Sequence, residues 1–419
     1  MLSLLKKCMV KLMYFKVEKV HAFLSYMTFS SCIVLLLHNF IFCFFWGAGI
    51  EVTEAFLMIF QAFFFCLVLL VTFYYSNKSL YPIMIGWILV FSLLSLFSGF
   101  GASYKSVFEI LVLPVFVFAG MISSVPMRKI RTAILSIIIF NFVVTMFEYI
   151  LPSYYVGYIP VGEYLLNTRS WMAEAAQGNE YEFYLAAARP GGTALGFSEQ
   201  RVGGIFLESL THSYFSSSLI FLVLYFFKSN WMKFWLIVPV FFSVLVADVR
   251  VGFALTMFYL ISYRFLSGKA NASILLLIIF FYCSGYLLSE YAEGGFSYRL
   301  SLNYDFWKSA SFLDLMGFGD ISGNSSDSAY VKLINAVGLP IILLLLIASE
   351  IVRLKYRNGF LLFMLIFAVV LTSFFGAAYF SAKVAPFIAY MVGWGLANGK
   401  EEVPFSTQYS GTVSNTSIR

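Results

Sequence analysis

Long apolar runs recur along almost the whole length of this chain, and they limit what it can fold into. A helix needs roughly 20 apolar residues to cross the hydrocarbon core of a bilayer. Hydrophobic residues make up 61% of the chain and charged residues only 11%, whereas a soluble domain carries roughly 25% charged residues. We therefore predict an all-α polytopic membrane protein of about 12 transmembrane helices. The predicted spans lie near residues 22–46, 54–75, 80–98, 107–124, 131–151, 209–227, 233–247, 251–265, 271–288, 330–349, 359–377 and 382–397.

The basic residues follow the order of these spans. Lysines and arginines gather on the cytoplasmic side of membrane proteins. Lys6, Lys7, Lys11, Lys16 and Lys19 precede the first span, and every second connection after it is basic. This pattern predicts that both termini are cytoplasmic. It also accounts for the formal net charge of +6, so we expect the lipid bilayer, and no nucleic acid, as a partner. The basic connections hold Lys78; Arg128, Lys129 and Arg131; Lys228 and Lys233; Arg264 and Lys269; and Arg353, Lys355 and Arg357.

This topology divides the chain into alternating membrane and polar segments. The predicted membrane segments are 22–151 with helices one to five, 209–288 with helices six to nine, and 330–397 with helices ten to twelve. A basic cytoplasmic segment covers 1–21, and a cytoplasmic tail covers 398–419. Two long loops on the opposite, outer side cover 152–208 and 289–329. We expect irregular and short helical caps in these loops.

The stretch from Phe234 to Tyr263 has two interpretations. A single helix would place Asp248 and Arg250 near the bilayer centre, where each charge costs a few kcal/mol. Two short spans that turn at residues 247–250 bring both charges to the outer face. We therefore predict two helices here.

Enzyme motifs of soluble proteins are missing from the chain. It has no P-loop, no dinucleotide fingerprint, no nucleophile elbow and no zinc-binding helix motif. Neither the histidines nor the five cysteines show metal-ligand spacing, so we expect no metal, no cofactor and no disulfide framework. His38, beside Asn39 in the first span, indicates a polar contact between helices.

The first outer loop combines arginines with aromatic residues. Arg169, Arg189 and Arg201 are interspersed with many tyrosines and with Trp171. A guanidinium group matches phosphate oxygens through two parallel hydrogen bonds, and aromatic rings pack against the apolar faces of sugars. This composition favours a glycan on a phosphorylated lipid as the ligand. A basic, aromatic loop lying on anionic headgroups is the alternative.

Three further features lie where the chain enters the membrane on the outer side. The stretch Arg201-Val-Gly-Gly-Ile-Phe-Leu-Glu208 has paired glycines that allow the backbone to approach a ligand closely. Arg250 follows Asp248 in the predicted turn, where the two can also pair simply to orient it. Asp327 ends a polar, glycine-rich run before the tenth span, where an aspartate also serves as a helix N-cap.

In their order, these motifs resemble the bacterial O-antigen polymerase family, which is related to the O-antigen ligases. The matching pieces are Arg201-Val-Gly-Gly-Ile-Phe, the turn before Arg250, Tyr298-Arg299 with Trp307 downstream, and Gly317-Phe-Gly319 followed by Asp327-Ser-Ala-Tyr330 and Gly338-Leu-Pro. The similarity extends over most of the chain. It implies a glycosyltransferase that joins undecaprenyl-diphosphate-linked oligosaccharide repeat units at the periplasmic face of the bacterial inner membrane.

The resemblance matches Arg201 and Arg250 to arginines that engage the donor diphosphate and matches Arg299 and Asp327 to outer-loop positions; the other roles are our hypothesis. Asp327 would accept the proton of the attacking sugar hydroxyl, and Glu208 is the alternative base. A chain-length regulator and a flippase are the implied protein partners. Arg201, Arg250 and Arg299 would bind the donor diphosphate, and Arg189, Trp307 and Tyr330 would contact the glycan.

Two other functions stay open at this point. An O-antigen ligase shares the architecture, but ligases resemble one another in a His-Asn pair where this chain has Asp327-Ser328. A lipid-linked oligosaccharide flippase or a permease should place charges near mid-membrane. In this chain the intramembrane charges, such as Glu109 and Glu148, gather toward the outer ends of the predicted spans.

Overall fold

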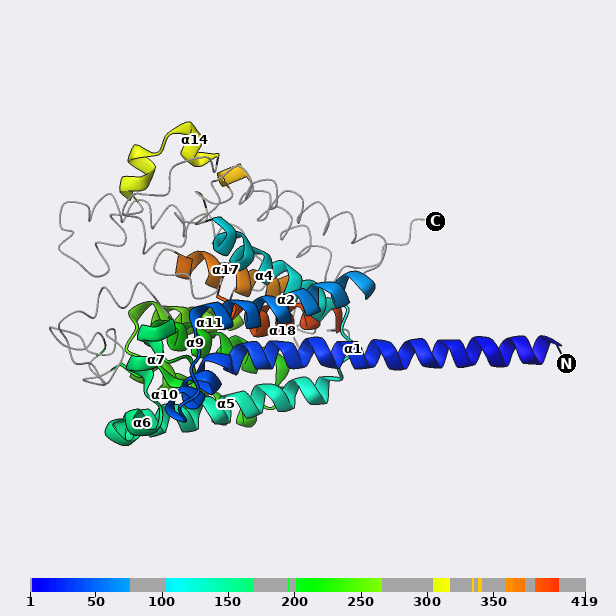
Figure 1. Ribbon diagram of the computed structural model, residues 1–419, viewed down its shortest axis with the longest axis horizontal. Coiled ribbons are helices and arrows are strands. Elements are labelled where there is room, and N and C mark those ends of the chain that lie inside the picture. The colour runs from blue at the N-terminus through cyan, green and yellow to red at the C-terminus, as the bar shows by residue number, and fades with distance from the viewer. Residues whose placement is uncertain are drawn as a thin grey trace, which may run out of the picture.

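The computed structural model describes residues 2–75, 103–168, 195, 201–265, 304–316, 334, 338–340, 359–373 and 381–398. Within these ranges every regular element is a helix, which confirms the all-α class (Figure 1). The elements are α1 (Leu2–Gly47), α2 (Glu54–Tyr75), α4 (Ser103–Met121), α5 (Met127–Ile150), α6 (Pro152–Tyr158), α7 (Val161–Thr168), the 3-10 turn η1 (Gly204–Phe206), α9 (Ser209–Phe226), α10 (Asn230–Val246), α11 (Arg250–Phe265), α14 (Phe312–Leu315), α17 (Gly359–Ser373) and α18 (Ala385–Asn398).

Four of the described helices are long and apolar enough to cross a membrane. They are Lys19–Gly47 within α1, together with α2, α5 and α9, and shorter apolar helices occur in α4, α10, α11 and α17. Large apolar side chains on α2, such as Ile59 and Leu70, are about 70% exposed. Such a surface requires lipid rather than water. The chain is therefore a membrane protein, while the predicted total of 12 spans extends beyond the described residues.

Helix α9 is the most enclosed of the long helices. Nearly all of its residues are buried, and α5, α10, α11 and α17 pack around it. Its first half is rich in small polar residues, among them Ser213, Ser216 and Ser217. Small side chains allow neighbouring helices to approach closely in a membrane. Ser217 donates a hydrogen bond to the Gly252 carbonyl of α11 at 2.8 Å, so the close approach also satisfies polar groups.

Helices α4 and α18 form a second tight pair, although more than 260 residues separate them in the chain. A Cβ atom added to Gly393 would lie 1.9 Å from the Val117 carbonyl oxygen, and one added to Gly120 would lie 2.1 Å from the Tyr390 carbonyl oxygen. The two backbones therefore touch at glycines, as in other small-residue crossings of membrane helices. The Ser123 hydroxyl and the Tyr390 hydroxyl, 2.6 Å apart, join the same pair of segments.

Helix α1 begins well before the predicted first span of 22–46. Its 46 residues run without a break from Leu2, and its first half projects beyond the other labelled helices (Figure 1). The basic N-terminal segment is thus a helical extension of the first span. The expected polar contact between helices is also confirmed, since the Gln61 side chain of α2 hydrogen-bonds to His38 at 2.9 Å.

The predicted break near residue 248 is confirmed, and the expected short helical caps appear as α6 and α7. Helix α10 ends at Val246 and α11 begins at Arg250. Of the predicted span 330–349, the structure describes only residues 334 and 338–340, where Gly338 has a left-handed backbone with φ of 77°. Its N–H donates to the Ile334 carbonyl oxygen at 2.7 Å, which ends a helical turn there. The spans predicted at 80–98 and 271–288 lie outside the described residues.

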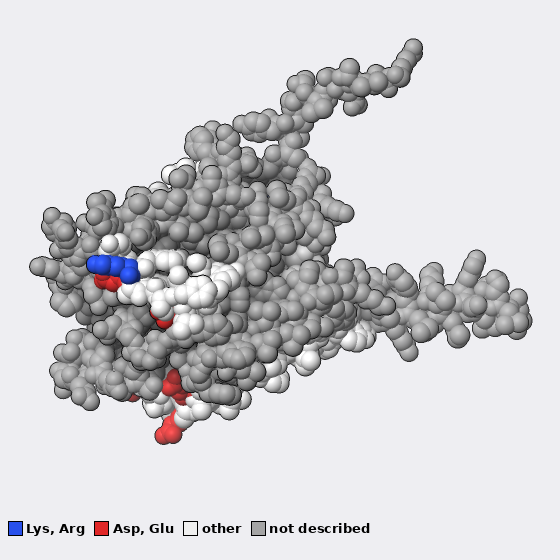
Figure 2. Space-filling model, turned by 90° about the horizontal axis from the view of Figure 1, so that it is seen from above, with Lys and Arg blue, Asp and Glu red and all other residues white. Residues whose placement is uncertain are grey.

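One face of the molecule shows few charged side chains among its described residues (Figure 2). On the face shown in Figure 2, most described residues are uncharged, and the few charged ones in view lie toward the end at which α6 and α7 stand in Figure 1. We call this end of the bundle the α6–α7 end. Helix α5 ends there at Ile150 and begins at the opposite end with Met127.

Candidate functional site

The loop that precedes α9 is anchored by a buried carboxylate at the α6–α7 end. The Glu148 side chain of α5 is only 8% exposed. Its two carboxylate oxygens accept hydrogen bonds from the backbone N–H groups of Gly203, at 2.9 Å, and Gly204, at 2.7 Å. Glu148 therefore fixes the position of the loop on α5.

Both glycines are required by this arrangement. Gly204 has φ of 54°, and a Cβ atom there would lie 2.5 Å from the His212 ring. A Cβ atom on Gly203 would lie 2.6 Å from the Leu207 backbone carbon. The sequence predicted a close approach of the backbone to a ligand at this pair, whereas the described close contacts are with the protein itself. The glycines let the loop turn tightly into α9.

Tyr155 of α6 supports the same turn from the other side. Its hydroxyl donates to the Gly204 carbonyl oxygen at 3.5 Å. Burial, reinforced by the nearby Glu148 carboxylate, raises the pKa of Tyr155 well above its usual value. The phenol therefore keeps its proton, and remains a hydrogen-bond donor, throughout the physiological pH range.

Arg201 and Arg250 are brought to the same end of the bundle by a backbone contact. The Val202 N–H donates to the Val246 carbonyl oxygen at 3.2 Å, which joins the residue after Arg201 to the turn before Arg250. Arg201 is half-buried, whereas Arg250 is exposed at the first position of α11. Two guanidinium groups on adjoining segments, one at the positive end of a helix dipole, make this region suited to binding an anion.

Asp248 shapes the turn between α10 and α11. It is 1% exposed and has a left-handed backbone with φ of 51°. Its carboxylate accepts a hydrogen bond from the Leu195 N–H at 2.5 Å. The sequence left open that Asp248 pairs with Arg250 to orient the turn; the described bond ties an earlier part of the loop to the turn.

Glu208 stands at the junction of the loop and α9, where both of its oxygens are engaged. One oxygen lies 2.9 Å from the Lys383 ammonium group, which precedes α18, and the other accepts a hydrogen bond from the Thr211 hydroxyl at 2.8 Å. The Lys383 and Glu208 side chains are only 12% and 15% exposed. This ion pair joins the start of α9 to the start of α18, which are 175 residues apart.

Sequence reasoning missed two of these residues. Lys383 lies at the outer end of the predicted last span, whereas basic residues of membrane proteins gather on the cytoplasmic side. This exception was the signal in the sequence that Lys383 has a specific partner. Glu148 was noticed only as a charge near the outer end of its span. Its carboxylate inside a 24-residue apolar helix was a signal for a buried polar contact.

The remaining predicted site residues are not joined to this cluster by the described structure. Asp327, Arg299, Arg189 and Tyr330 lie outside the described residues. Trp307 is described and half-buried, and its ring lies 6.0 Å from the Phe306 ring. Its segment, 304–316, stands apart from α9 and α11 in Figure 1.

Comparisons with known proteins do not assign this site to a family. No family model, curated protein or solved structure matches the chain. Among the described residues there is also no group of three histidine, cysteine, aspartate or glutamate side chains that can hold a metal ion.

Proposed function

We propose that this protein is a membrane glycosyltransferase that polymerises oligosaccharide repeat units carried on undecaprenyl diphosphate. The resemblance to O-antigen polymerases supplies the substrate class. The observation that supports it most is the clamped loop, in which Glu148 holds Gly203 and Gly204 while the Val202–Val246 bond brings the Arg201 segment to the Arg250 turn. A polymerase of this kind needs fixed cations where its donor diphosphate leaves.

In the proposed reaction, a sugar hydroxyl of the acceptor attacks the anomeric carbon of the donor glycan. The bond from that carbon to the phosphate oxygen breaks, and undecaprenyl diphosphate departs with the electron pair. Arg201 and Arg250 stabilise the charge that develops on the leaving group, an effect worth a few kcal/mol for each well-placed cation. A carboxylate accepts the proton of the attacking hydroxyl.

The described contacts favour Asp327 over Glu208 as that carboxylate. Both Glu208 oxygens already accept from Lys383 and Thr211. These two contacts hold the Glu208 carboxylate against α9 and the start of α18. We therefore assign Glu208 a structural role at the junction of α9 and α18, and leave the proton transfer to Asp327.

Surface polysaccharide from cells lacking the gene, separated on a gel beside that from complemented cells, tests the function. We expect the mutant to keep a single repeat unit on its lipid A-core and to lose the ladder of longer chains. Bare lipid A-core with accumulated lipid-linked polymer would indicate a ligase instead. An unchanged pattern would contradict a role in this polymer and favour a permease.

Variants of the two arginines test the site. At membrane levels matched to the wild type, we expect cells with Arg201→Ala or Arg250→Ala to lose most of the polymer. Arg201→Lys and Arg250→Lys should keep part of it, because a lysine retains the positive charge but cannot form the two parallel hydrogen bonds of a guanidinium group. Lys129→Ala, an exposed cation at the opposite end of the bundle, is the control and should make normal polymer. Full-length polymer from both arginine variants would refute the assignment.

A further inference from the structure

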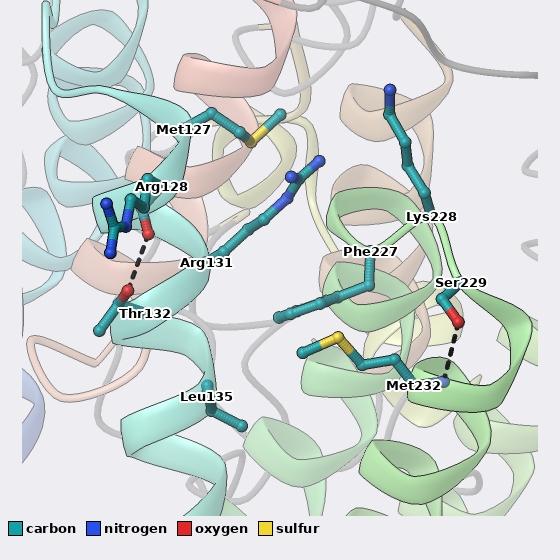
Figure 3. Close-up of a pocket in the computed structure, with 9 residues that line it drawn as sticks. All are labelled: Met127, Arg128, Arg131, Thr132, Leu135, Phe227, Lys228, Ser229 and Met232. Atoms are coloured by element: carbon teal, nitrogen blue, oxygen red, sulfur yellow. Dashed lines mark hydrogen bonds between the residues drawn. The ribbon is translucent and has the colours of Figure 1, made fainter.

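A cavity opens between α5 and the α9–α10 connection, at the end of the bundle opposite the α6–α7 end. Its volume is about 800 Å³. Figure 3 shows that α5 provides one wall and the connection with the first turn of α10 provides the other. The lining residues are Met127, Arg128, Arg131, Thr132, Leu135, Phe227, Lys228, Ser229 and Met232.

The cavity is basic. Three of its nine lining residues are cations and none is acidic. Arg131 extends from α5 toward the connection that holds Lys228 (Figure 3), and its Nε donates to the Phe226 carbonyl oxygen at 2.6 Å. That bond holds the guanidinium group at the cavity while its terminal nitrogens keep further donors.

Two helix dipoles add to this positive potential. Helix α5 begins at Met127 and α10 begins at Asn230, so the N-termini of both helices lie at the cavity. Ser229 caps α10 by accepting from the Met232 N–H at 3.4 Å. The positive ends of helix dipoles favour bound anions, especially phosphate groups.

The apolar lining distinguishes this cavity from a site for a free ion. Phe227 and Met232 point from the α9–α10 side toward α5, and Leu135 lies one turn further along α5 (Figure 3). The cations and the apolar residues therefore line one continuous space. Such a space fits a ligand with an anionic head and an apolar body.

Aromatic residues on the first turns of α10 place the cavity at the level of lipid headgroups. Trp231, Phe234 and Trp235 are 70%, 56% and 54% exposed, and the two tryptophan rings lie 5.4 Å apart in an edge-on contact. Exposed tryptophans of membrane proteins concentrate where hydrocarbon meets water. Met232, which lines the cavity, lies within the same turns.

From these observations we propose that the cavity binds an anionic phospholipid, with its phosphate against Arg131 and Lys228 and its glycerol and first acyl carbons against Phe227, Met232 and Leu135. Basic pockets between membrane helices bind such headgroups in other proteins. With the predicted topology, the lipid belongs to the cytoplasmic leaflet. The positive-inside rule alone asks only that these connections be basic; it does not require that they enclose a cavity.

Native mass spectrometry of the full-length protein, released from bilayers of equal phosphatidylglycerol and phosphatidylcholine, tests the proposal. We expect wild-type protein to retain phosphatidylglycerol in preference to phosphatidylcholine. Lys228→Gln should lower that preference several-fold, because each cation near an anionic lipid surface contributes a small but measurable attraction. Lys129→Gln is the matched control, since Lys129 is an equally exposed lysine on α5 that does not line the cavity.

Further variants separate charge from fold. Arg131→Gln should also lose the preference, while Arg131→Lys combined with Lys228→Arg should keep it, because both cations remain. Millimolar inorganic phosphate should not displace the retained lipid. Equal loss in Lys228→Gln and Lys129→Gln would overturn the proposal in favour of diffuse surface attraction. Retention unchanged in both Lys228→Gln and Arg131→Gln, or displacement by inorganic phosphate, would overturn it as well.

Discussion

Replacing Glu148 by alanine tests the anchor of the candidate site most directly. The change removes the acceptor of the Gly203 and Gly204 N–H groups and leaves both donors in a buried environment. Each buried donor that is left without a partner costs roughly 1–3 kcal/mol, so the two together cost roughly 2–6 kcal/mol. The cost of burying the carboxylate offsets part of this sum. We expect Glu148→Ala to lower the free energy of unfolding by about 3 kcal/mol, or roughly a hundredfold in the folding equilibrium.

Unfolding by dodecyl sulfate in mixed micelles provides the measurement. Glu163→Ala is the control, because Glu163 is an exposed carboxylate on α7 near the same end of the bundle; its loss should change the free energy by less than about 0.5 kcal/mol. Glu148→Gln keeps one carbonyl oxygen and should show about half the loss of the alanine variant. Equal unfolding curves for Glu148→Ala and Glu163→Ala would refute the reasoning that the carboxylate holds the loop.

Two further predictions concern contacts between helices that are distant in sequence. Gly393→Ala should strongly reduce the yield of monodisperse protein on size-exclusion chromatography, because the new Cβ would meet the Val117 carbonyl oxygen. Gly157→Ala is the control and should behave like the wild type, because a Cβ atom there has no other atom within 4 Å. A normal yield of Gly393→Ala would contradict the close crossing of α4 and α18. For the Glu208–Lys383 ion pair, a double-mutant cycle with Glu208→Gln and Lys383→Met should give a coupling energy of about 1–2 kcal/mol. A coupling near zero in the unfolding assay would show that the pair does not stabilise the junction of α9 and α18.

The helical class, the membrane environment and the positions of many helices follow from the sequence alone. Both the apolar runs and the low content of charged residues can be recognised without any knowledge of the fold, because they are local or compositional properties. The break between α10 and α11 was predictable for the same reason, since the cost of burying Asp248 and Arg250 depends only on their depth in the membrane. The glycine pair at 203–204 indicated a close backbone approach to a ligand, whereas the described close contacts are with the protein itself.

Which side chains and backbone groups pair with one another was decided only by the tertiary structure. Glu148 and the glycines that it binds are 55 and 56 residues apart, and Glu208 and Lys383 are 175 apart. No local pattern selects one carboxylate among several to meet a particular N–H group or ammonium group. These pairings depend on which helices become neighbours when their small residues and apolar faces pack. The basic connections of the chain are a further example. The sequence showed that they are basic and so indicated the topology, but only the packing of α5 beside α9 and α10 places their cations around one cavity.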